Sequence, residues 1–331
     1  MVKADAYGHG GVGVARVLEE SGVAVLGVAY LEEALVLRRA GIGAPLLVFA
    51  GCLAGQERAF VEHGLTPVVS SAETLEVALA AARGERAPWR VHLEVDTGMT
   101  RLGVAPSEAL AAVRRLSEAG LVVEGVMTHL AAADQDAALT GLQLDRFDTL
   151  LADLAGQGCG PSLAHAANSS GLAFLRPSHT AVRPGLLLYG VRPRPLAPDI
   201  DVEPVMSVTA RVLQVRPVSA GTGVSYGVRW RARRPSRLAT VAFGYADGLP
   251  RTAAASERGF VVLRGARAPI VGAVCMDFTV VDVTEIPSVV EGDEAVVLGE
   301  SPSAWELAEW AGTNPWQILA AIAPRVPRVY A

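Results

Sequence analysis

The chain has 331 residues, of which 51% are hydrophobic and 19% are charged, and its net charge is −5. This length and composition predict a folded globular protein with room for two domains, or for one barrel with an appendage. The acidic balance and the absence of a long basic run argue against nucleic acid as the main partner.

The lengths of the apolar runs and the spacing of the cysteines indicate where in the cell the protein is expected. Every apolar run is interrupted well before the roughly 18 residues that a membrane span requires, and the first residues carry no signal-peptide pattern. Cys52, Cys159 and Cys275 are widely spaced and form no CxxC pair, which argues against a disulfide framework and a zinc site. We therefore expect a soluble, cytoplasmic protein without a metal.

Up to about residue 190, short apolar runs alternate with stretches whose apolar residues recur at helical spacing. The predicted strands cover residues 23–29, 46–49, 66–70, 91–95, 122–129, 163–167 and 181–189. The predicted helices cover residues 12–20, 31–40, 56–63, 72–83, 106–119 and 137–157. Such alternation forms parallel βαβ units. With a short strand at residues 1–3, the pattern predicts an α/β fold, a (β/α)8 TIM-type barrel.

The pattern changes at residues 191–198, where prolines exclude a helix and indicate a linker. The strand-like segments beyond it cover residues 206–215, 238–243, 259–264, 269–274, 280–283 and 294–298, and helical spacing returns at 303–311 and 315–323. The sequence therefore predicts two domains, a barrel at residues 1–201 and a mainly-β domain at residues 202–331.

The predicted barrel lacks one helix. A barrel of this kind has a helix beside each strand, yet the last predicted strand leads directly into the proline-rich linker. We expect the eighth helix to come from upstream of Lys3, so that this sequence begins inside the first strand. An apolar seam left uncovered would make this form poorly stable.

Lys3 is the only lysine among the 29 Lys and Arg residues. A solvated surface accepts either cation, whereas arginine stays protonated and cannot form an imine. A lysine retained in such an arginine-rich chain is a candidate for Schiff-base or general-base chemistry. The alternative is that it survived by chance near a flexible start.

Polar residues gather at the carboxyl ends of the predicted strands, where barrel enzymes place their functional groups. They supply an amine, two guanidiniums, imidazoles and hydroxyls, without a carboxylate-rich or histidine-rich cluster. This set suits an anionic cofactor and an anionic substrate better than a metal. The residues are Lys3, Tyr7, Asp96, Met99, Arg101, His129, His165, Asn168, Ser169, Arg183 and Gly185.

Residues 2–10, with the sequence VKADAYGHG, closely resemble the pyridoxal-phosphate motif of alanine racemases, which have this barrel followed by a β domain. Further resemblances to that family follow in order along essentially the whole chain. They are DTGMTRLG at residues 96–103, MTH at 127–129, HAANS at 165–169, RPG at 183–185, YG at 189–190, VSYG at 224–227, GYADG at 244–248, CMD at 275–277 and RVPRVY at 325–330.

The resemblance implies pyridoxal 5'-phosphate as the cofactor, held by Lys3 as an imine. An imine requires a neutral amine, so the pKa of Lys3 must be lowered by the other cations of the site. Arg183 is implied to face the pyridine nitrogen and to leave the ring neutral, which restrains side reactions. Further cofactor-binding residues implied are Tyr7, Ser169, Gly185, Leu186 and Tyr330 at the phosphate, and His129 and Asn168.

The implied reaction interconverts L-alanine and D-alanine on an external aldimine and supplies D-alanine for peptidoglycan. Inversion needs a base on each face of a planar carbanion. The resemblance assigns Lys3 to one face and Tyr226 to the other, with Tyr226 coming from the second subunit of a head-to-tail homodimer. His129 is expected to lower the pKa of Tyr226.

The resemblance also implies a substrate-binding set and a supporting set. Arg101 and the backbone amide of Met276 should bind the substrate carboxylate. Glu94 stands where many relatives have a carbamylated lysine, and we expect it to offer negative charge to Arg101 directly. The other supporting residues are His165, Cys275 and Asp277, with Tyr245 and Arg251 at the entrance. Relatives often carry an arginine at the position of Ala273.

The remaining histidines are expected to serve structure. His9 lies beside glycines, which indicates a turn residue or a residue behind the site. His63, His92 and His179 are expected to be surface or packing residues, because histidines that are half buried often have structural roles.

Three alternatives stay open: a racemase of broader specificity, an amino-acid decarboxylase of the same fold, and a non-catalytic pyridoxal-phosphate carrier. Arg183 argues against the decarboxylase, which benefits from a carboxylate that keeps the ring protonated. Carriers resemble the barrel alone, so the β domain with Tyr226 argues against the third alternative. By the same resemblance, Tyr330 narrows the pocket and favours alanine over larger amino acids.

Overall fold

The computed structural model describes residues 1–83, 89–195, 198–256 and 258–330. Residues 196 and 197 of the predicted linker thus lie outside the described residues. Contacts divide the chain into two compact units. Unit 1 comprises Met1–Ala6, Gly10–Leu188 and Arg192–Val202, and unit 2 comprises Tyr7–His9, Tyr189–Val191 and Glu203–Ala331.

Unit 1 is built on a parallel sheet whose strands follow one another in chain order. The strands are β1 (Leu26–Val28), β2 (Leu46–Val48), β3 (Leu65–Val69), β4 (Arg90–Glu94), β5 (Val122–Met127) and β6 (Leu163–His165). Most of their residues are buried, as expected for parallel strands covered on both faces. The predicted parallel α/β architecture is therefore confirmed for this unit.

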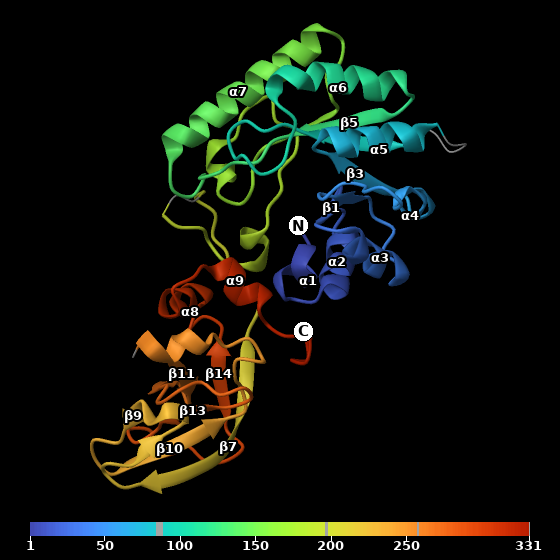
Figure 1. The fold of residues 1–331 in the computed structure, drawn as a ribbon. Helices are drawn as coiled ribbons and strands as arrows, with labels where there is room; N and C mark the ends of the chain where they lie inside the picture. The colour runs from blue at the N-terminus through green and yellow to red at the C-terminus, as the bar shows by residue number, and fades with distance from the viewer. Residues whose placement is uncertain (84–88, 196–197, 257, 331) are drawn as a thin grey trace. The chain divides into compact units, whose positions relative to one another are not determined.

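Helices cover the outside of these strands. They are α2 (Gly11–Glu20), α3 (Leu31–Arg39), α4 (Glu57–Glu62), α5 (Ala72–Ala82), α6 (Pro106–Glu118) and α7 (Ala137–Gly156). Their starts follow local chemistry: the Ser71 hydroxyl and the Asp136 carboxylate each accept a hydrogen bond from a backbone amide in the first turn of α5 and α7. α3 packs on β1 and β2, α5 on β3, and α6 on β5 (Figure 1).

The predicted strand at residues 181–189 is wrong. The segment is extended only as far as Pro184, and residues Leu186–Tyr189 form the 3-10 helix η2. Proline has no backbone N–H, so it cannot continue a ladder of hydrogen bonds between strands. The apolar run that suggested a strand is buried in helical form instead.

Hydrogen bonds nevertheless close the barrel through two segments that are not regular strands. On one side, the Arg183 amide donates to the Ala167 carbonyl, just beyond β6, at 2.8 Å. On the other side, the Met1 nitrogen donates to the Pro184 carbonyl at 3.1 Å, and the Val2 amide donates to β1 at 2.9 Å. The strand predicted at residues 1–3 is not formed as a regular strand: only Met1 and Val2 make these hydrogen bonds, and Lys3 begins the helix α1 (Lys3–Tyr7).

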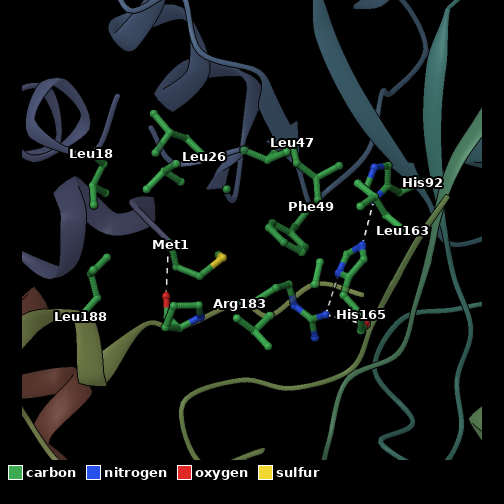
Figure 2. Close-up of a pocket in the computed structure, with 16 residues that line it drawn as sticks. Met1, Leu18, Leu26, Leu47, Phe49, His92, Leu163, His165, Arg183 and Leu188 are labelled. Atoms are coloured by element: carbon green, nitrogen blue, oxygen red, sulfur yellow. Dashed lines mark hydrogen bonds between the residues drawn. The ribbon is translucent and has the colours of Figure 1, made fainter. Parts of the chain in front are cut away.

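A cavity of about 670 Å³, counted with its opening to solvent, lies inside unit 1. Most of its lining is apolar and includes Leu47, Phe49 and Leu163. The polar part of the wall is formed by three side chains, His92, His165 and Arg183 (Figure 2).

Unit 2 is an antiparallel β-barrel. Its sheet has the order β12-β11-β14-β7-β10-β13, and a bridge between Ile270 and Val281 links its two ends. The strands are β7 (Val208–Val218), β10 (Ser236–Val241), β11 (Phe260–Leu263), β12 (Ala266–Pro269), β13 (Thr279–Asp282) and β14 (Glu294–Leu298), beside a small ribbon of β8 (Gly223–Val224) and β9 (Trp230–Arg231). The helices are η3 (Tyr226–Val228), η4 (Arg251–Ser256), α8 (Ala304–Ala311) and α9 (Pro315–Ala320).

The predicted strand at residues 269–274 is also misplaced. The regular strand β12 ends at Pro269. Beyond it, the Ile270–Val281 bridge and the Val271 amide, which donates to the Val280 carbonyl, join the chain to β13 without forming a regular strand. Gly272 then turns the chain with a φ of +75°. A Cβ at Gly272 would lie 2.8 Å from the Val224 carbonyl oxygen, so the chain bends where only glycine fits.

Among the described residues, every helix is too short or too polar to cross a lipid bilayer.

The glycine of the N-terminal motif has a packing role that can be tested. Gly8 has a φ of +77°, and a Cβ there would lie 2.1 Å from the Leu319 carbonyl oxygen in α9. Gly22 has nearly the same φ, +76°, with nothing within 4 Å of its Cβ position. We expect Gly22→Ala to cost about 1 kcal/mol and Gly8→Ala about 2–4 kcal/mol of unfolding free energy, measured by urea denaturation. Equal losses in the two variants would contradict a clash at Gly8.

Candidate active site

The N-terminal motif forms a left-handed turn. In α1 (Lys3–Tyr7), the four residues after Lys3 have φ between 53° and 55°. Each costs about 1–2 kcal/mol for an L-residue, so the turn needs support from its surroundings. The Glu33 carboxylate accepts from the Ala4 amide at 2.6 Å, and the Asp5 carboxylate accepts from the Gly11 amide at 2.6 Å. Strain of this kind is typical of functional segments.

Lys3 is half buried at the start of this turn. Burial is the largest cause that lowers the pKa of its amine, and the charges of Arg101 and Arg183 lower it further. The carboxylate of Glu33 opposes them. The pKa of Lys3 is lowered as expected, although desolvation contributes more than the neighbouring cations do. A larger fraction of neutral amine is therefore present near pH 7 than for an exposed lysine.

Arg183 is the most deeply embedded cation of unit 1. Its Nη1 donates to Nδ1 and to the carbonyl of His165, at 2.7 and 2.6 Å. Its Nη2 donates to the carbonyls of Thr128 and Ala166 and to Nδ1 of His129, at 2.8, 3.0 and 3.2 Å. Within the described part of the chain, its Nε–H has no hydrogen-bond partner. Burial lowers the pKa of Arg183 to about 10, so the guanidinium remains charged at neutral pH.

His129 and His165 are neutral beside this guanidinium. Burial, followed by the charge of Arg183, lowers the pKa of His129 to about 3 and that of His165 well below its usual value. Because a guanidinium only donates, Nδ1 of each ring must be an acceptor and Nε2 must carry the proton. The two imidazoles are thus fixed as hydrogen-bond partners of Arg183.

Glu94 at the end of β4 is a buried carboxylate on which the charges of Arg183 and Arg101 act. Burial raises its pKa, and the charges of Arg183 and then Arg101 oppose that rise. No hydrogen bond joins Glu94 to Arg101 in the described structure. The negative charge expected for Arg101 therefore acts on both arginines, and more strongly on Arg183.

Backbone amides converge on Ser169. Its hydroxyl accepts from the Gly185 amide at 2.9 Å and from the Leu187 amide at 3.2 Å, where η2 begins. The resemblance implied the backbone amides of Gly185 and Leu186 as donors to a phosphate, which stays a prediction. The bond from the Leu187 amide to Ser169 was not indicated by the sequence. Neighbouring Asn168 accepts from the Gly171 amide at 2.8 Å and supports the 3-10 helix η1 (Gly171–Phe174).

Three further predicted residues lie together in unit 2. The rings of Tyr7 and His9 stack on Tyr189, with centroids 5.0 and 4.4 Å away. The Tyr330 hydroxyl donates to the His9 carbonyl at 3.2 Å. Burial raises the pKa of Tyr7 to about 12, so its hydroxyl stays protonated and can donate. His9 is buried, which agrees with a place behind the site.

Tyr226 is displayed on a strained turn of unit 2. Its side chain is 73% exposed at the start of η3, and Ser225 before it has a φ of 59°. The Ser225 hydroxyl donates to the Ala273 carbonyl at 2.6 Å and lies 3.4 Å from the sulfur of Cys275. The turn is therefore anchored to the segment that precedes Met276.

That segment carries the other predicted residues of unit 2. The Tyr245 amide donates to the Cys275 carbonyl at 3.0 Å, and Arg325 joins Asp277 to Asp247 at 2.8 and 2.7 Å. Arg251 is exposed at the start of η4. We call the exposed apolar residues gathered here the exposed face, namely Tyr226, Tyr245, Met276 and Phe278.

The sequence missed His92. We expected a surface or packing residue. His92 is buried, as a packing residue would be, and its Nδ1 also lies 2.8 Å from Nε2 of His165, a contact that was not predicted. Strand alternation was the available signal, because His92 and Glu94 lie two apart on β4 and so share a face. His179 is also buried and hydrogen-bonds to Asp148, whereas His63 is exposed. No cluster of metal-binding type occurs among the described residues.

The fold and the site define a two-domain barrel protein in which an amine lies among cations, an arrangement suited to an anionic ligand. Comparison with known proteins gives the family. Residues 1–193 match "Alanine racemase, N-terminal domain", and residues 205–330 match "Alanine racemase, C-terminal domain". The chain therefore belongs to the alanine racemase family.

Individual relatives agree over the full length of the chain. It is 41% identical to the alanine racemase of Halothermothrix orenii and 43% identical to that of Sorangium cellulosum, covering 100% of this chain and 89% and 90% of theirs. The crystal structure of alanine racemase from Streptomyces lavendulae matches with a TM-score of 0.91 at 38% identity, covering 100% of this chain and 89% of that one. The biosynthetic enzyme from Pseudomonas aeruginosa matches with a TM-score of 0.87 at 35% identity, covering 100% and 91%. The predicted fold, a barrel followed by a mainly-β domain, is confirmed.

The lowered pKa of Lys3 predicts how the cofactor-free chain reacts with an acylating reagent. Only the neutral amine reacts, so half-maximal labelling of Lys3, followed by mass spectrometry, should occur below pH 10.5. Arg101→Leu removes a cation and should raise the pKa, whereas Glu33→Gln removes an anion and should lower it. Arg58→Leu, on the surface, should leave it unchanged. Shifts of the same sign for Arg101→Leu and Glu33→Gln would contradict this electrostatic account.

Proposed function

We propose that the protein racemises alanine, interconverting its L and D forms with pyridoxal 5'-phosphate as cofactor, and that this supplies D-alanine for peptidoglycan. The observation that carries the proposal is the amine of Lys3, whose pKa is lowered by burial and by Arg101 and Arg183. It occurs in a chain that matches alanine racemases over its whole length.

The residues present fit this cofactor. The hydroxyl of Ser169 and the backbone amides of Gly185 and Leu186 would bind the phosphate, in the segment where the amides of Gly185 and Leu187 donate to that hydroxyl. Tyr7 and Tyr330 would donate hydrogen bonds to the phosphate through their phenol hydroxyls. His129 and Asn168 would be further cofactor-binding residues, and Lys3 would supply the amine. When bound, pyridoxal phosphate provides an electron sink that acidifies the α-hydrogen of an amino acid.

Arg183 would direct the chemistry through its remaining donor. Its Nη groups are held by carbonyls and imidazoles, so Nε–H is the group left to face the pyridine nitrogen. With a pKa of about 10, the guanidinium donates a hydrogen bond without giving up its proton at neutral pH. Arg183 would thereby leave the cofactor ring unprotonated and less strongly electron-withdrawing, which would favour simple return of one proton over longer reaction sequences.

Two bases would act on opposite faces of the substrate. Lys3 removes or returns the proton on one face, and Tyr226 does so on the other. We assign Tyr226 to a second copy of the chain in a head-to-tail homodimer. The support is that its phenol is 73% exposed within an apolar exposed face, which an isolated chain would leave in water.

The substrate carboxylate would be bound by a guanidinium and an amide. Arg101 is exposed. Its charge acts on Lys3 and on Glu94 and favours a lower pKa for both groups. The Met276 amide has no partner among the described residues and belongs to the exposed face. Tyr245 and Arg251 are candidates for the substrate entrance, and Cys275 and Asp277 for the dimer interface.

A cytoplasmic location is consistent with the sulfur chemistry. Cys52, Cys159 and Cys275 are all free thiols. Free thiols without disulfides are typical of a reducing compartment.

The function is tested by an absorbance spectrum and a chiral assay on alanine, serine and lysine. We expect a yellow protein after loading with pyridoxal phosphate, and conversion of alanine well above that of the two larger amino acids. Lys3→Arg keeps the charge but cannot form an imine, so it should lose both the colour and the activity. An imine absorbance band in Lys3→Arg, distinct from the band of the free aldehyde, would reject Lys3 as the attachment point, and faster turnover of serine or lysine would favour the broad-specificity alternative.

The role of Tyr226 predicts an effect that depends on direction. Tyr226→Phe removes the base on one face, so the rate from L-alanine should fall by about 10²–10⁴-fold, with exchange of the D-alanine α-hydrogen into solvent retained in part. Stopped-flow spectra and deuterium exchange on each enantiomer measure this. Equal loss of exchange from both enantiomers would rule against the two-face assignment.

Sharing of the site between copies can be tested by mixing inactive variants. A heterodimer of Lys3→Ala and Tyr226→Phe chains contains one site with both native residues if each site uses residues from two copies. Activity should therefore return when the variants are co-expressed. If Lys3 and Tyr226 acted within one chain, every site in the mixture would lack one of them and the activity would stay absent.

A further inference from the structure

A line of polar contacts leads from Arg183 to the surface of unit 1. Nδ1 of His165 accepts from Arg183, and Nε2 of His165 lies 2.8 Å from Nδ1 of His92. Nε2 of His92 lies 3.6 Å from the carboxylate of Glu124, which is paired with the exposed Arg90. Figure 2 shows Arg183, His165 and His92 in sequence along the cavity wall.

Arg183 determines which atom donates and which accepts in each hydrogen bond of this line. A guanidinium only donates, so Nδ1 of His165 must accept and the proton must lie on its Nε2. That proton is donated to Nδ1 of His92, which places the proton of His92 on its Nε2, facing the carboxylate of Glu124. Burial lowers the pKa of His92 to about 4, so both rings are neutral at pH 7 and each carries one proton at a defined nitrogen.

Gly125 makes this contact possible. β5 lies between β4 and β6, and Gly125 on β5 is the register partner of His92. The His92 ring therefore crosses over β5 to reach His165. A Cβ at Gly125 would lie 2.4 Å from Nδ1 of His92. Glycine weakens a strand interior, so its use here indicates that the space is needed by the histidine ring.

We infer that His92 is a positioning residue for the reaction, because it accepts the proton of His165 and so holds the ring that orients the Arg183 guanidinium. Without this acceptor, the Nε2–H of His165 would be buried and unsatisfied, which favours rotation of the ring and loss of its bond to Arg183. The catalytic part of the inference rests on the proposed function, in which Arg183 faces the pyridine nitrogen.

The first test uses the unaltered, cofactor-free chain. Nitrogen-15 NMR of labelled histidines distinguishes a protonated ring nitrogen from an acceptor. We expect His165 and His92 both to carry their proton on Nε2, without titrating between pH 5.5 and 9. A proton on Nδ1 of either ring would overturn the inference, and this measurement needs no variant except for assignment.

The second test compares His92→Leu with His92→Asn in the loaded enzyme. The carboxamide oxygen of asparagine can accept in place of Nδ1, whereas leucine cannot. We expect His92→Leu to lower kcat for alanine by about tenfold with little change in KM, and His92→Asn to recover most of the loss. In the cofactor-free chain, the His165 Nε2 resonance should shift in His92→Leu and stay near its native position in His92→Asn.

The matched control is His179→Leu. His179 is another buried histidine of unit 1, bonded to Asp148 and packed on Phe147, and it makes no hydrogen bond to His165 or Arg183. It should lower the melting temperature while leaving kcat and the tautomer of His165 unchanged. Equal losses of kcat in His92→Leu and His92→Asn, or an unshifted His165 resonance in His92→Leu, would overturn the inference. If the native chain did not racemise alanine, the proposed function would fail, yet the NMR result would still decide whether His92 holds His165.

Discussion

The interior of the barrel depends on one constraint, the burial of the Arg183 guanidinium. A buried charge is unfavourable unless its donors are satisfied and its charge is countered. Backbone carbonyls at the ends of β5 and β6 and the Nδ1 atoms of His129 and His165 accept from it. The carboxylate of Glu94 supplies the opposing charge. The guanidinium thus organises the groups around it as well as the proposed cofactor contact.

Burial and the charge of Arg183 together determine the protonation of the site. Burial is the larger cause, and the charge of Arg183 adds to it, so Lys3 loses its proton more readily and the buried imidazoles of His129 and His165 stay neutral. A site with this pattern combines a nucleophilic amine with fixed cations for anionic groups. Unit 2 supplies a different feature, the exposed phenol of Tyr226 on a strained turn. In the proposed reaction this phenol acts in the active site of a second copy of the chain. The two units therefore contribute complementary chemistry to the proposed reaction.

Much of the fold was predictable from local patterns, and the errors have physical causes. Alternation of strand-like and helical segments predicted the parallel strands of unit 1 and their helices. The strand predicted at residues 181–189 failed because Pro184 cannot continue a ladder, and the strand at 269–274 failed because Gly272 turns the chain. The contact of His92 with His165 was not predicted because nothing local showed that Gly125 on the next strand leaves room for the His92 ring. Which residue of one strand lies beside a side chain of the next depends on the pairing register, which local periodicity does not specify.

The amino-acid sequence by itself determined the family, the single lysine available for imine chemistry, and the residue types of the proposed site. These properties follow from the composition and from the order of the motifs along the chain. Only the tertiary structure decided why Gly8 must be glycine, since the carbonyl it meets belongs to Leu319. It also decided how the proton of His165 is oriented and that burial is the largest cause of the lowered pKa of Lys3. Each of these depends on groups distant in the chain, whose contacts exist only after the strands have paired and water has left the barrel interior.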